Sequence, residues 1–126
     1  MPLRIVASLC LLSFLIVTAS AFAQSDPLSG TWTGDWGPSA RDRNQVTVAL
    51  KWDGKALTGT VNPGPEAVQL EKASFDAKTG AVRMEARVAA RGTTLHYIIE
   101  GKLEKNVMSG SWNHDDRKGD FKITRQ

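Results

Sequence analysis

Apolar and polar residues alternate with a period of two along most of the chain that follows Gln24. Turn-forming residues interrupt this alternation roughly every dozen positions, a spacing typical of all-β domains. No stretch of useful length carries the 3.6-residue apolar period of an amphipathic helix. Because side chains alternate between the two faces of a strand, the pattern predicts strands with one buried and one solvated face.

Eight such strands are predicted, and in each of them every second residue faces inward. They cover Leu28–Trp36, Asn44–Trp52, Leu57–Val61, Ala67–Phe75, Ala81–Ala90, Leu95–Leu103, Met108–Trp112 and Phe121–Arg125. In the fourth strand the apolar phase changes between Leu70 and Ala73, which predicts a β-bulge near Lys72.

The connections are predicted from turn residues. Asp53-Gly54 favours a tight two-residue hairpin, because a primed turn requires positive φ angles. The polar stretches Gly37–Arg43 and His114–Gly119 are expected to form longer loops.

A short motif of apolar residue, Ser or Thr, Gly, variable residue and apolar residue recurs in the chain. It occurs at Leu28–Trp32, Leu57–Val61 and Met108–Trp112, with a looser copy at Ile99–Leu103. The glycine falls on the buried face, where a missing side chain leaves room for a neighbouring aromatic ring and lets the strand bend. We therefore predict an eight-stranded antiparallel up-and-down barrel, because pairing of the first and last strands removes both exposed edges. An open sandwich of two four-stranded sheets is the alternative.

The N-terminal region has the pattern of a cleaved signal peptide. Arg4 precedes an apolar run from Ile5 to Val17, and small residues lead up to Gln24. We predict that residues 1–23 are removed and that residues 24–126 form a single domain in the periplasm or outside the cell. The apolar run is too short for a stable membrane span of about 20 residues.

Composition narrows the choice of partners. The chain has 16 basic and 13 acidic residues, and the basic residues are scattered rather than clustered, so no nucleic-acid partner is expected. Its one cysteine, Cys10, lies in the predicted signal peptide. The domain must therefore fold without a disulfide, unlike many small secreted scaffolds.

The two ends of the predicted domain resemble the calycin pattern of lipocalins and related barrels. Gly30 and Trp32 begin the first strand, and Arg125 stands alone on the last. The resemblance implies that Arg125 packs over Trp32 as a structural pair where the barrel closes, a contact worth about 0.5 to 2 kcal/mol. The segment Asp53–Thr60 is similar to the avidin branch, and Ser29-Gly30-Thr-Trp32 is similar to the opening of the small periplasmic metalloprotease inhibitors.

Aromatic residues on the inward phase are the candidate ligand site. All four tryptophans, Trp32, Trp36, Trp52 and Trp112, fall on this phase. Trp36 and Trp52 stand at strand ends, where pockets open, and Tyr97 shares the inward phase. We predict that Trp36, Trp52 and Tyr97 bind the ligand; the alternative is that the aromatic rings only fill the core.

Signals for metal binding and catalysis are weak. His114-Asp115-Asp116 offers three ligand types in a row, but adjacent residues do not easily converge on one ion. Glu85 and Glu100 lie on outward phases, where general acid or base catalysis is not expected. We therefore predict no catalytic residues, no metal and no cofactor, and treat an enzyme that uses His114 and its acidic neighbours as a third hypothesis.

Together these patterns predict an exported, non-enzymatic barrel that binds a small apolar or amphipathic molecule at its open end. The second hypothesis is a protein-binding module, such as a periplasmic protease inhibitor, that acts through residues 24–28 and the loops.

Overall fold

The computed structural model describes residues 26–126, so the predicted signal peptide, residues 1–23, lies outside the described residues. These residues fold into eight strands. The strands are β1 (Gly30–Ser39), β2 (Asp42–Trp52), β3 (Leu57–Val61), β4 (Val68–Asp76), β5 (Ala81–Ala90), β6 (Thr93–Glu104), β7 (Val107–His114) and β8 (Arg117–Arg125).

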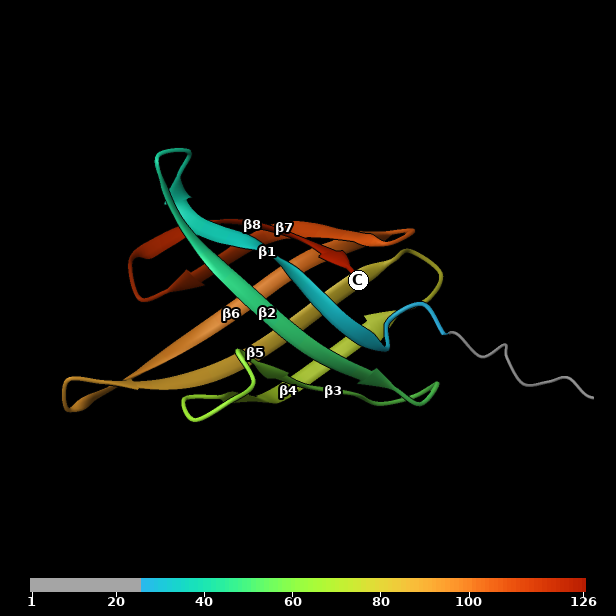
Figure 1. Ribbon diagram of the computed structural model, residues 1–126, viewed down its shortest axis with the longest axis horizontal. Coiled ribbons are helices and arrows are strands. Elements are labelled where there is room, and N and C mark those ends of the chain that lie inside the picture. Colours follow the sequence, from blue (N-terminus) through green and yellow to red (C-terminus); the bar gives the residue numbers. More distant parts are fainter. Residues whose placement is uncertain (1–25) are drawn as a thin grey trace, which may run out of the picture.

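The strands form one closed antiparallel barrel in sequence order (Figure 1). Each strand pairs with the next, and β8 returns to pair with β1 from Trp32 opposite Arg125 to Gly37 opposite Asp120. The predicted up-and-down barrel is therefore confirmed, and the open sandwich is excluded. Figure 1 also shows the hairpins β1–β2, β5–β6 and β7–β8 turning at one end of the barrel, while the N-terminal segment joins at the other.

Bulky side chains and glycines share the interior, as the repeated motif predicts. The fully buried or nearly buried apolar core comprises Leu28, Trp32, Val48, Leu50, Leu57, Val82, Met84, Met108, Trp112, Phe121 and Ile123. Gly110 of β7 stands directly opposite Gly101 of β6. A Cβ on Gly110 would overlap the carbonyl oxygen of Glu100 and the Cα of Gly101, so this close approach of two strands requires glycine.

The bulge predicted in β4 is present. The register between β4 and β5 shifts between Leu70 and Lys72, and the inward phase changes from Leu70 to Ala73 as a result. The extra residue keeps apolar side chains inside on both sides of the irregularity.

The predicted loop Gly37–Arg43 is wrong, because β1 and β2 continue through it to a two-residue turn between Ser39 and Asp42. The Arg43 guanidinium holds this hairpin together. It forms ion pairs with Asp35 of β1 and Asp120 of β8 and donates to the carbonyl oxygens of Gly37 and Ser39. A cross-strand arginine thus turns a polar stretch into a strand pair.

Two other connections also differ from prediction. The expected loop His114–Gly119 is only a two-residue turn, with Asp115 at φ 53°, and its flanking residues belong to β7 and β8. The hairpin at Asp53 has four connecting residues rather than two, since Trp52 pairs with Leu57. The Asp53 carboxylate accepts hydrogen bonds from the backbone N–H groups of Ala56 (2.7 Å) and Lys55 (2.8 Å), and these bonds hold the pKa of Asp53 below its usual value.

Candidate functional site

The barrel interior contains a cavity of about 290 Å³ that opens to solvent. Asn62 and Glu66, which line it, belong to the connection between β3 and β4, so the mouth lies at the end where the β1–β2, β5–β6 and β7–β8 hairpins turn. Most of the wall is apolar or aromatic. Its residues are Trp36, Val46, Val48, Val61, Asn62, Glu66, Val68, Leu70, Met84, Ala86, Val88, Tyr97, Ile99, Trp112, Phe121 and Ile123.

Three aromatic rings from three strands form part of the wall. The centroids of Trp36 and Trp112 are 5.1 Å apart, and those of Trp36 and Tyr97 are 6.1 Å apart, both pairs nearly perpendicular. Edge-to-face contact of this kind is favourable because the positive edge of one ring meets the negative face of the next. The Trp112 indole is further fixed by donating to the carbonyl oxygen of Asp120 (3.1 Å). The aromatic wall is thus held in place by its own contacts.

The polar groups of the lining are few and concentrated at the mouth. Asn62 is held rigidly, because its backbone N–H donates to the carbonyl oxygen of Thr47 (2.6 Å) and its side-chain oxygen accepts from the Thr47 N–H (3.1 Å). Glu66 is exposed and is the one charged residue among the lining residues. No cation within residues 26–126 forms an ion pair with its carboxylate.

Tyr97 is the one ring of the aromatic wall that carries a titratable hydroxyl group. Burial raises the pKa of the Tyr97 phenol, while the positive charge of Arg117 acts in the opposite direction. The ring of His114 lies 4.5 Å from that of Tyr97 and stacks on Trp112, with an interplanar angle of 16°. His114 is only 8% exposed. His114 is therefore buried, whereas Asp115, Asp116, Arg117 and Lys118 after it are exposed. The missed signal for His114 was its two-residue step from the inward-facing Trp112.

The structure separates the three residues predicted to bind ligand. Trp36 and Tyr97 line the cavity together. Trp52 does not line it and instead packs edge-to-face against Phe75, with a centroid distance of 5.4 Å. Its hydrogen-bonded neighbour is Ser29, whose hydroxyl accepts from the Trp52 N–H (2.9 Å), at the end where the chain enters the barrel.

That other end is filled rather than open. Leu28 is completely buried, and its carbonyl oxygen accepts a hydrogen bond from the Trp32 indole (2.8 Å). The guanidinium of Arg125 lies 5.6 Å from the Trp32 ring centroid and donates to the carbonyl oxygens of Asp26 and Ser29. Trp32 and Arg125 thus lie together where the N-terminal segment covers the barrel.

No group of three or more metal-ligating His, Cys, Asp or Glu side chains comes together within residues 26–126. The outer surface carries ordinary cross-strand pairs. His96 Nε2 lies 2.9 Å from the Glu85 carboxylate, and this hydrogen bond lowers the pKa of Glu85. In the same part of the chain, no helix has the length and apolar character needed to cross a bilayer.

Compared with protein-family models, curated proteins and solved structures, the chain has no significant match.

Proposed function

We propose that this protein is an exported barrel that binds a small apolar or amphipathic molecule in the cavity between Trp36, Tyr97 and Trp112. The apolar part of the ligand contacts the aromatic and aliphatic wall, and any polar end lies near Asn62 and Glu66 at the mouth. The N-terminal sequence pattern supports export to the periplasm or beyond.

The observation that carries the proposal is the open cavity itself. Protein interiors are normally close-packed, and a small domain loses stability when apolar interior is left unfilled. This barrel nevertheless keeps about 290 Å³ unfilled, close to the lower limit of about 300 Å³ typical of ligand sites. An apolar space with a few polar groups at one end is the usual chemistry of a small-molecule site.

We also propose that the barrel belongs to the calycin type. The Trp32–Arg125 contact at the covered end and the eight-stranded up-and-down topology support this assignment. This second proposal concerns the type of barrel and does not identify a particular ligand.

The contacts of residues 26–28, the described part of the N-terminal segment, support ligand binding over protein binding through that segment. Asp26 accepts hydrogen bonds from the N–H groups of Leu28 (2.8 Å) and Ser29 (2.6 Å), and Arg125 binds its carbonyl oxygen. Residues 26–28 therefore cover the barrel end, whereas a segment that enters a protease cleft must project from its scaffold.

Titration with the neutral fluorophore N-phenyl-1-naphthylamine tests the proposed function. We expect saturable binding at one site, with quenching of tryptophan emission by energy transfer. Trp36→Leu should weaken binding severalfold, because it removes part of the cavity wall, and Trp52→Leu at the covered end should leave the affinity nearly unchanged. Absence of saturable binding to the wild-type protein would refute the proposal.

A further inference from the structure

We infer that the cavity selects molecules with an apolar or aromatic body and one positively charged amine, whose ammonium group lies at the mouth beside Glu66. This inference rests on the proposed function and adds the charge of the ligand to it. It follows from the charges around the mouth, from the aromatic wall, and from the exposure of Glu66.

Glu66 supplies the charge. It is the one ionisable carboxylate on the cavity lining, and within residues 26–126 it has no ion-pair partner. Some other carboxylates do have one, such as Glu71, which pairs with Arg87, and Asp35, which pairs with Arg43. A ligand cation would therefore meet a free negative charge, and a ligand anion would be repelled by it.

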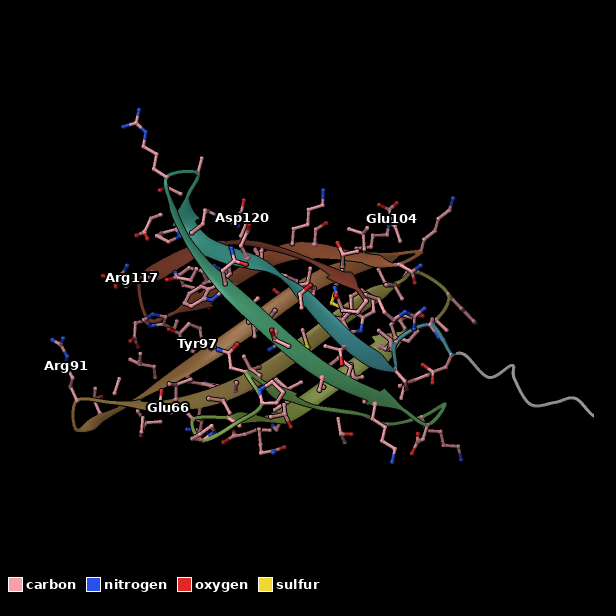
Figure 2. The ribbon with its side chains drawn as sticks, in the orientation of Figure 1. Glu66, Arg91, Tyr97, Glu104, Arg117 and Asp120 are labelled. Atoms are coloured by element: carbon pink, nitrogen blue, oxygen red, sulfur yellow. The ribbon has the colours of Figure 1, made fainter. Side chains whose placement is uncertain are left out.

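None of the cations at this end, Arg41, Arg43, Arg91, Arg117 and Lys118, lines the cavity, although the charge of Arg117 reaches the Tyr97 phenol. Arg43 is already held by Asp35 and Asp120 on the outer surface. Arg91 and Arg117 are placed at or beside hairpin turns and do not line the cavity. Figure 2 shows both of them at the outer margin of the barrel end, with Tyr97 further inside.

The aromatic wall favours the same ligand charge. The π face of Trp or Tyr attracts a cation within about 6 Å of the ring centroid. Trp36, Tyr97 and Trp112 line a cavity of about 290 Å³, so a ligand that fills it is in contact with these rings. The methylene groups beside an ammonium share its positive charge and benefit from the same attraction.

The depth of the charged group decides how the amine is placed. A fully buried ammonium would lose its hydration at a large cost in free energy. Glu66 is exposed, so an ammonium beside it stays partly hydrated while the apolar body of the ligand enters the cavity. This arrangement selects by charge at the mouth and by shape below it.

Three probes of similar size test the inference: 2-phenylethylamine, propylbenzene and 3-phenylpropionate, each used to displace N-phenyl-1-naphthylamine from the full protein. At pH 7 and low salt we expect the amine to bind about tenfold more tightly than the carboxylate, because Glu66 attracts one and repels the other. Glu66→Gln should weaken amine binding about threefold to fivefold, the range of an exposed ion pair, and should not weaken propylbenzene binding. Glu104→Gln, at the opposite end of the barrel in Figure 2, is the matched control and should change neither.

Each outcome of these displacement experiments either supports or overturns the inferred preference for amines. Amine preference that falls in Glu66→Gln and persists in Glu104→Gln supports the inference. Equal affinities, a preference for the carboxylate, or an amine preference that survives Glu66→Gln would overturn it while leaving the proposed function intact. Failure of all three probes to displace a bound fluorophore would also overturn it, whereas failure of the fluorophore itself to bind would overturn both.

Discussion

Replacing Ala86 with leucine tests directly whether the cavity is real space. Ala86 lies on β5 between Leu70 of β4 and Tyr97 of β6, and all three residues line the cavity. Its side chain is 3% exposed, so a larger side chain would extend into the cavity rather than into solvent. We expect Ala86→Leu to stabilise the protein and to block ligand binding.

The size of the stabilisation follows from burial. Leucine adds three carbon groups, worth about 0.8 kcal/mol each when buried, or about 2.4 kcal/mol in total. Ordering its side chain costs about 0.5 to 1 kcal/mol. The net gain of about 1.5 kcal/mol corresponds to a rise in Tm of about 6 to 12 °C for a domain of this size.

Thermal unfolding followed by circular dichroism measures the change, and fluorophore titration measures binding. Ala73→Leu is the control, because Ala73 packs against the core without lining the cavity. Overpacking there should cost about 1 to 3 kcal/mol and lower Tm. A fall in Tm for Ala86→Leu similar to that of Ala73→Leu would show that the barrel interior is filled and would refute the reasoning.

Three further changes test the rest of the structure. Gly110→Ala places a methyl group against the backbone of β6, so it should lower the free energy of unfolding by about 3 kcal/mol or more and lower Tm by at least about 12 °C. The control Ser109→Ala, on the outer face, should change Tm little. Arg125→Met should lower Tm by several degrees, because it removes the contact with Trp32 and several hydrogen bonds; near-ultraviolet circular dichroism should report the altered tryptophan environment. Asp53→Ala should lower Tm at neutral pH, and its difference in Tm from wild type should disappear in acid. The reason is that the pKa of Asp53 is depressed in the folded protein. The stabilisation by its carboxylate is therefore present above the usual pKa of 3.8 and is lost as the pH falls through the lowered value. A Tm difference for Asp53→Ala that stays constant from pH 7 to pH 2 would contradict that assignment.

The architecture was predictable because its determinants are local in the sequence. Alternation of apolar residues sets the inward face of each strand, and the change of phase between Leu70 and Ala73 has no simple explanation other than a bulge. Glycine within such a pattern marks close strand approach, as at Gly110. Strand ends were harder to predict, because the β1–β2 hairpin is extended by Arg43, whose partner Asp120 lies 77 residues further along the chain. The residues around Arg43 in the sequence do not predict a contact with a residue so far along the chain.

The site was only partly predictable for a related reason. The inward phase correctly places Trp36, Trp52 and Tyr97 inside, but it does not say at which end of the barrel each lies. The strand directions do say it: Trp36 lies near the end of β1 and Trp52 at the end of the antiparallel β2, so the two residues lie at opposite ends of the barrel. Glu66 carries no periodic signal at all, because it precedes β4 in a connection whose path is fixed by the barrel.

The covered end of the barrel stabilises the fold, and the open end is the proposed binding site. At the covered end, Leu28, Trp32 and Met108 are completely buried, and Arg125 ties the N-terminal segment to the last strand. This packing offsets what the open end gives up by leaving its interior unfilled, since a small domain without disulfides has little stability to spare. Substitutions at the covered end should therefore change Tm without changing which ligand charge is preferred, and substitutions at Glu66 should do the reverse. A loss of charge preference in Arg125→Met, measured below its unfolding temperature, would show that the two ends are coupled and that this division is wrong.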